Sequence, residues 1–333
     1  MPNPLLPRGA FARLGIVALI ALFFAVPQIA RAEWKDMNSD VNATNFIVKV
    51  GPPDSPSGLC TGTLISLKYR LVLTANHCVD DNIAIEEKEE TSDNGVVDKV
   101  KREVFTDMQL EQKNYQGFRN VGSATFLSRI VAHKKAYDLG LLQIRADTIP
   151  QTVYSHVLGT DGKVERGDTV FAVGNPRGLD ASVSKGIVSS TTRMIKVSWA
   201  DADVPFYQVD AAINSGNSGG ALYNADGQLI GLPDASAGAG LGLAIPVDVL
   251  RKFLTENCYE DVWNDGNAAK THDQCVADKL KEENDRREKN GVAPLQPSDK
   301  AESSGGLTLK ALNDMEERRQ TSIFDLFTMD HAH

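Results

Sequence analysis

The chain has 333 residues, of which 42% are hydrophobic and 24% are charged, and its formal net charge is −9. This composition is that of a globular protein with a sizeable core, and it excludes a chain that is disordered throughout. The negative charge argues against generic nucleic-acid binding, which needs a basic face to neutralise phosphates, and we find no basic cluster dense enough to override it.

Residues 1–32 have the pattern of a secretory signal peptide. Two arginines precede an uncharged run at 14–26, and Ala30-Arg31-Ala32 matches an A-x-A cleavage site. We therefore expect an exported mature chain that begins near Glu33. A retained membrane anchor is the alternative, although the apolar run is at the short limit for crossing a bilayer.

Short apolar runs separated by Gly, Pro, Asp and Asn dominate the chain from Phe46 to Ile245, which indicates an all-β region. The predicted strands lie at 46–48, 63–65, 70–74, 129–131, 141–144, 169–173, 184–190, 194–199, 206–209, 228–232 and 241–245. Between them, residues 86–122 are poor strand material, and we expect much of this segment to be surface loop, with Asn94-Gly95 as a candidate hairpin turn. The acidic cluster at 86–90 is read as a solvated face, with a calcium or substrate role as the alternative.

The hydrophobic period changes after residue 245. Apolar residues at helical spacing predict a closing helix over 246–257. Acid-to-base pairs four residues apart predict an exposed helix over 278–289. Residues 291–306 are linker-like, and 307–333 begin with an amphipathic helical pattern. The domains expected are the signal peptide 1–32, a domain at 33–258 and a charged, partly helical tail at 259–333.

Ser218 lies in the glycine-rich stretch Gly216-Asn217-Ser218-Gly219-Gly220 and is the candidate nucleophile. Glycine lets the backbone take positive φ and bring its N–H groups close to a bound carbonyl oxygen. A glycine-rich turn is the alternative explanation. A serine hydroxyl is a poor nucleophile at neutral pH, so it needs an imidazole base and a carboxylate that orients the imidazole.

His77 and Asp138 are the candidates for these two roles. His77 follows the apolar run 71–73, and Asp138 precedes the run 139–144. The order His, Asp, Ser is that of chymotrypsin and differs from those of subtilisin and the α/β-hydrolases. We expect surface or packing roles for the remaining histidines, which are His133, His156, His272, His331 and His333. No His or Cys pair has zinc-ligand spacing, so no metal site is predicted.

These three motifs resemble those of trypsin-like serine proteases. The stretch 74–78 (TANHC) resembles their Thr-Ala-Ala-His-Cys box, 138–142 (DLGLL) resembles their Asp-Leu-Ala-Leu-Leu box, and 210–220 (DAAINSGNSGG) is most similar to the HtrA (Deg) branch. Segments at 171–179, 186–189 and 243–246 also resemble HtrA segments in order, so the resemblance covers about 46–257. It implies two packed six-stranded β-barrels of the chymotrypsin type, with the active site in the cleft between them.

The resemblance also implies the chemistry of a serine endopeptidase. Ser218 attacks the scissile carbonyl, His77 transfers the proton, and Asp138 orients His77. The N–H groups of Gly216 and Ser218 form the oxyanion hole. No metal or organic cofactor is required. Asn217 stands where trypsin-like zymogens usually carry an Asp that pairs with a newly cut N-terminus, so activation by such cleavage is not expected.

The specificity pocket is expected to be aliphatic. Ala212 stands six residues before the nucleophile, where trypsin carries an aspartate. A pocket lined by Ala212 and Ile213, with Leu243 or Ile245, cannot pair with Arg or Lys, so small or medium aliphatic P1 residues should be preferred.

Export is consistent with disulfide bonds, which persist in oxidising compartments. The four cysteines, Cys60, Cys78, Cys258 and Cys275, allow three pairings. In many trypsin-like proteases a bridge ties the histidine loop at the places of Cys60 and Cys78, so the resemblance implies this pair and leaves Cys258 for Cys275. Free buried thiols are the alternative.

We therefore expect an exported endopeptidase, in the periplasm as the resemblance suggests, that acts on misfolded envelope proteins. A secreted or membrane-anchored form is the alternative location. A dedicated processing protease that docks a partner through its tail, and a chaperone-like binding protein, are the alternative functions. The resemblance suggests a homo-oligomer, a trimer by analogy with HtrA proteins. We expect protein or peptide substrates, no PDZ domain, no nucleic-acid partner and no membrane span after signal cleavage.

Overall fold

The structure is a computed structural model. It describes residues 37–91, 97–116, 119–145, 163–264, 268–289 and 294. The predicted signal peptide, the Asn94-Gly95 turn, His156 and the predicted elements of 295–333 lie outside these residues. None of the helices within the described ranges is long and apolar enough to cross a membrane.

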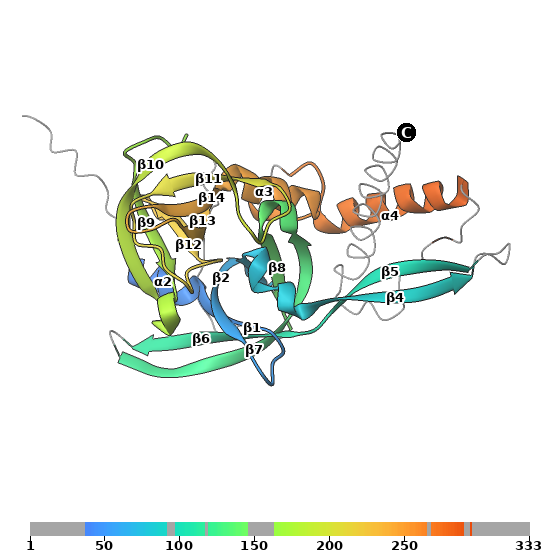
Figure 1. Cartoon of the computed structure of the whole chain (residues 1–333), viewed down its shortest axis with the longest axis horizontal. Coiled ribbons are helices and arrows are strands. Elements are labelled where there is room, and N and C mark those ends of the chain that lie inside the picture. Colours follow the sequence, from blue (N-terminus) through green and yellow to red (C-terminus); the bar gives the residue numbers. More distant parts are fainter. Residues whose placement is uncertain are drawn as a thin grey trace, which may run out of the picture.

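Two closed six-stranded barrels form the body of the molecule, and neighbouring strands in both are antiparallel (Figure 1). The first barrel, in the order β1-β2-β3-β8-β7-β6, consists of β1 (Asn45–Val50), β2 (Gly58–Ser66), β3 (Leu71–Thr74), β6 (Met108–Gln116), β7 (Arg119–Lys134) and β8 (Leu139–Ile144). The second, in the order β10-β11-β14-β13-β12-β9, consists of β9 (Thr169–Gly174), β10 (Ser182–Lys196), β11 (Asp203–Val209), β12 (Ala221–Asn224), β13 (Leu229–Ser236) and β14 (Gly242–Pro246). The prediction of two six-stranded barrels is confirmed.

One continuous apolar cluster spans both barrels. It includes Leu73 and Leu141 of the first barrel and Phe206 and Leu232 of the second, and all four side chains are buried. Burial of apolar surface between the barrels stabilises their relative position, because it removes both faces from water. The loops at this junction are thereby held in fixed positions.

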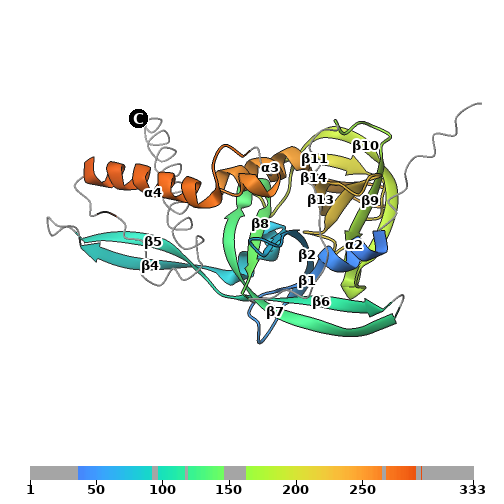
Figure 2. The same cartoon turned by 180° about the vertical axis from the view of Figure 1, so that it is seen from behind.

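The expectation of surface loop over much of 86–122 is wrong. Strands β4 (Ile83–Thr91) and β5 (Val97–Phe105) form a separate two-stranded ribbon, and the segment then continues into β6 and β7. In the ribbon Glu87 pairs with Lys101 and Glu89 with Lys99. Opposite charges on paired strands attract, so a charged sequence is compatible with this ribbon. The ribbon extends away from the barrels on the same side as the last described helix (Figure 2).

Strand β6 lies in the segment expected to be surface loop, although its residues alternate between buried and more exposed positions. Met108, Leu110 and Gln112 are buried, while the residues between them are partly exposed. Two further differences concern the second barrel. The predicted strands 184–190 and 194–199 are one bent strand, β10, with two register shifts against β11, and β12 was not predicted.

Helices close the ends of the described chain. The predicted helix at 246–257 is α3 (Val247–Glu256), whose Val247, Leu250, Phe253 and Leu254 are buried. The helix predicted at 278–289 begins earlier, as α4 (His272–Lys289), because Thr271 and Gln274 form a reciprocal capping box. An unpredicted helix, α2 (Met37–Thr44), precedes β1. Short 3-10 turns lie at η1 (Asn76–Cys78), η2 (Asp80–Asn82), η3 (Lys135–Tyr137), η4 (Pro176–Gly178) and η5 (Glu260–Val262).

Candidate active site

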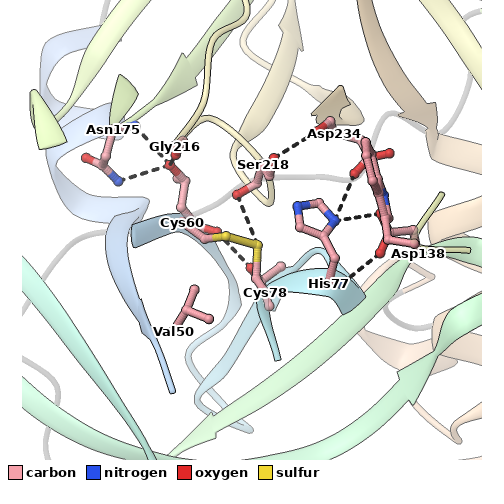
Figure 3. Close-up of a disulfide and its surroundings, with 12 residues drawn as sticks. Val50, Cys60, His77, Cys78, Asp138, Asn175, Gly216, Ser218 and Asp234 are labelled. Carbon is pink, nitrogen blue, oxygen red and sulfur yellow. Dashed lines mark hydrogen bonds and ion pairs between the residues drawn. A yellow bond between two sulfur atoms is a disulfide. The ribbon is translucent and has the colours of Figure 1, made fainter. Parts of the chain in front are cut away.

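His77 is held at the junction of the barrels by β3 and a disulfide. Strand β3 ends at Thr74, and the turn η1 then presents His77 with its side chain 23% exposed. The next residue, Cys78, is bonded to Cys60 of β2, with 6.1 Å between their Cα atoms (Figure 3). The histidine loop is therefore covalently tied to the barrel.

Asp138 lies against His77 from the start of β8. Its φ of 52° is in the left-handed region, which Asp adopts more readily than most residues. One carboxylate oxygen, Oδ1, accepts the backbone N–H of His77 at 2.9 Å, and Oδ2 lies 2.8 Å from His77 Nδ1. This pairing places the proton on Nδ1 and leaves Nε2 with a free lone pair, as a general base requires.

The carboxyl group of Asp138 is fully buried but keeps its negative charge. Burial alone would raise the pKa of this carboxyl group, but the hydrogen bonds with His77 lower it below its ordinary value. A charged Asp138 can orient the imidazole and support its positive charge when it takes up a proton.

Ser218 comes from the second barrel, on a loop docked against the first. Its carbonyl oxygen accepts the N–H of Thr61 in β2 at 2.9 Å, and the Thr61 hydroxyl donates to Gly216 O at 2.6 Å. Gly219 has a φ of 83°, and a Cβ atom there would lie 2.2 Å from the carbonyl oxygen of Thr61. The close approach of the two barrels therefore requires glycine at this position.

The Ser218 hydroxyl is not bonded to His77 in this conformation. It donates to the backbone carbonyl of Asp234 at 2.8 Å, and a hydroxyl has only one proton to donate. Rotation of the serine side chain would be needed to form the bond to Nε2. Catalytic hydrogen bonds are often formed only when substrate binds.

Among the described residues, the backbone hydrogen bonds of the serine loop involve other N–H groups than those of Gly216 and Ser218. The N–H of Asn217 donates to Asn214 O, that of Gly219 to Pro233 O, and that of Gly220 to Asn217 O. None of these bonds uses the N–H of Gly216 or of Ser218, the two donors expected in the oxyanion hole. Gly216 has a φ of 97°, a conformation that favours glycine.

The residues expected in the specificity pocket lie in different surroundings. Ala212 is exposed, and Ile213 is buried, with its Cδ1 atom 2.8 Å from the place of a Cβ atom on Gly242. Leu243 and Ile245 belong to the apolar cluster that spans both barrels, whereas Ile213 belongs to a second cluster. On β14, Gly242 and Ala244 therefore lie on the side of Ile213, whereas Leu243 and Ile245 belong to the other cluster.

Two residues that the sequence analysis did not single out lie at the His77–Asp138 pair. Trp199 donates its Nε1–H to Asp138 Oδ2, and its ring centroid lies 5.2 Å from that of His77. The carboxylate oxygen Oδ1 of Asp234 lies 3.5 Å from His77 Nδ1. The sequence carries a signal for Asp234, an acidic residue directly after the apolar run 229–233, but none that points to Trp199.

Two of the other histidines have packing roles, as expected. His133 Nε2 pairs with Glu103 at 2.8 Å, and its Nδ1 lies 3.0 Å from Asn76 Oδ1. His272 stacks on Tyr259, with ring centroids 4.4 Å apart.

The two barrels and the site at their junction define a protein of the chymotrypsin-like fold. The family model for the trypsin-like peptidase domain matches residues 60–232, just over half of the chain. The chain belongs to this family.

Several curated relatives of the HtrA type match part of the chain. Serine protease HTR4 of Rattus norvegicus is 41% identical over 120 residues, which cover 36% of this chain and 24% of that protein. A probable periplasmic serine endoprotease, DegP-like, of Marinomonas sp. is 38% identical over 136 residues, which cover 39% of this chain and 28% of that protein. The match therefore spans about a quarter of the length of these relatives. The crystal structure of the serine endoprotease from Yersinia pestis is 25% identical with a TM-score of 0.47, covering 69% of this chain and 67% of that one.

Proposed function

We propose that this protein is a serine endopeptidase of the HtrA type, with His77, Asp138 and Ser218 as its catalytic triad. The observation that carries the proposal is the 2.8 Å contact between His77 Nδ1 and Asp138 Oδ2. This contact lies beside a glycine-rich serine loop that the other barrel supplies. The alternative explanation of that loop as a simple turn does not account for the buried acid against His77.

The proposed reaction proceeds in two halves. Ser218 Oγ attacks the scissile carbonyl carbon while His77 Nε2 accepts its proton, and the N–H groups of Gly216 and Ser218 bind the oxyanion. His77 then returns the proton to the leaving amine, and an acyl-enzyme on Ser218 results. Water hydrolyses this ester by the same proton transfers, and no cofactor takes part.

A fluorophosphonate probe tests whether Ser218 is an activated nucleophile. We expect one labelled site, at Ser218, because the probe reacts readily only with a serine whose hydroxyl can pass its proton to a neighbouring base during the attack. The measurement is peptide mapping by mass spectrometry, with and without an unfolded substrate such as casein. Labelling only with casein would show that Ser218 becomes reactive when substrate binds. No labelling in either condition would contradict the proposal.

The proposed specificity is for small or medium aliphatic P1 residues, since Ala212 and Ile213 carry no charge that could pair with a basic side chain. A peptide library digested by the full chain and read by mass spectrometry should show cleavage after Val, Ala, Ile or Leu. Dominant cleavage after Arg or Lys would refute the aliphatic pocket.

We further propose export, with the signal peptide at 1–32, and a periplasmic location, in line with the DegP-like relatives. Misfolded envelope proteins are the proposed substrates. The proposed protease domain, 33–258, and the start of the tail are joined by the Cys258–Cys275 disulfide and by a bond from Lys279 Nζ to Glu256 O. A docking role for the tail and a trimeric assembly are proposals on family analogy alone.

A further inference from the structure

Both the backbone and the side chain of Asp234 lie against residues of the proposed triad. It belongs to β13, where the pairing with β14 shifts between Pro233 and Ala235. The shift makes Asp234 the extra residue of a β-bulge, and bulges re-aim side chains near active sites. Its carbonyl accepts the Ser218 hydroxyl, and its side chain points to His77 and Asp138 (Figure 3).

Among the described residues, the Asp234 carboxyl group has one long contact with a nitrogen, at 3.5 Å from His77 Nδ1, and no hydrogen bond. Its side chain is 0% exposed, and neither oxygen has a hydrogen-bond donor among the described residues. His77 Nδ1, Asp138 and Asp234 each place one atom within 4.8 Å of the others. Two adjacent buried carboxylates beside one imidazole repel each other, so a proton is retained by one of them.

The hydrogen bonds assign the charge to Asp138 and the proton to Asp234. Asp138 accepts from the backbone N–H of His77, from His77 Nδ1 and from Trp199 Nε1. These three donors stabilise a carboxylate, and Asp234 receives none of them. Burial first, and then the negative charge of Asp138, raise the pKa of Asp234 well above its ordinary value.

We propose that Asp234 is a positioning residue of the catalytic triad: it is a neutral carboxylic acid that donates a hydrogen bond to Asp138 and so holds that carboxylate against His77. This inference rests on the proposed function. Because a protonated acid is both donor and acceptor, it also accounts for the two buried oxygens that otherwise lack partners.

The pH dependence follows from the groups that face Asp234. Among the described residues these titratable groups are His77, from η1, and Asp138, from the start of β8, while Trp199 and Ser218 are the neutral neighbours of the site. When pH passes the raised pKa of Asp234, its proton is lost, the bond to Asp138 breaks, and two negative charges repel. Activity should then decline.

Two variants of Asp234 separate donation from packing. In Asp234→Asn the amide can donate to Asp138 but cannot ionise, so we expect near-neutral kcat/KM to be retained and the alkaline decline to disappear. In Asp234→Ala the donor is absent, so we expect kcat to fall about tenfold to a hundredfold across the pH range, the effect of one hydrogen bond to a charged group. An alkaline decline unchanged in Asp234→Asn, or an unchanged kcat in Asp234→Ala, would overturn the proposal.

Infrared difference spectroscopy of the full chain provides a readout independent of proteolysis. At neutral pH the wild type should show the C=O stretch of a protonated carboxyl group that Asp234→Asn lacks. An absent band in a protein that cleaves casein contradicts the role of Asp234 and leaves the proposed function standing. A band in a protein that does not cleave casein contradicts the proposed function instead. A pH profile that changes on EDTA treatment would assign the neutralising charge to a bound cation and refute the shared proton.

Discussion

Replacing Ser218 by alanine is expected to lower kcat for casein by about 10⁶-fold, because the hydroxyl that forms the acyl-enzyme is removed. The His77→Ala variant should lose a similar amount. The double variant should lose little more than either single one, since the two residues act as a unit. Initial rates with a fluorogenic casein substrate measure all three losses.

A matched control distinguishes loss of the nucleophile from damage to the loop. Ser215→Ala makes the same chemical change three residues earlier in the same loop, at an exposed position. It should keep most of the wild-type activity. Thermal unfolding should show that Ser218→Ala is folded, and substantial casein cleavage by that folded variant would contradict the assignment of the nucleophile.

Replacing both Cys60 and Cys78 by serine is expected to destabilise the fold by about 3 kcal/mol, because the bridge no longer restricts the unfolded chain. Activity should fall as well, since Cys78 follows His77 directly and the loop that carries the imidazole loses its tie to β2. Urea unfolding gives the free energy, and kcat/KM for casein gives the effect on the site.

The second disulfide offers a control of nearly equal loop length. The two bridges span sequence separations of 18 and 17 residues, so loop closure predicts similar destabilisation for both pairs. Cys258 and Cys275 link the segment that follows α3 to α4 and take no part in the hydrogen bonds described for the proposed catalytic residues. The variant with serine at both should therefore lose stability but keep its kcat. Equal losses of kcat in the two variants would show that the Cys60–Cys78 bridge has no particular effect on the site.

Much of the fold could be predicted because each barrel strand carries its own local pattern. Strands β3, β8, β9 and β14 are short, mostly apolar runs bounded by turn residues, which is a signal that needs no neighbour to interpret. The ribbon β4–β5 has no such pattern, since its strands consist largely of charged residues. It forms because each charged strand pairs with the other. Pairing depends on the partner strand, so it cannot be predicted from either strand alone.

The candidate site also combines features that the sequence specifies with features that depend on the tertiary structure. The sequence by itself determined the chemical groups His77, Asp138 and Ser218, their order and the glycines around the serine, because residue identity and spacing are local properties. Only the tertiary structure decided which two carboxyl groups lie close enough to share one negative charge. In the sequence Asp234 is one acidic residue at the end of an apolar strand, and its proposed role depends on the bulge of β13, which places it beside Asp138 and out of water.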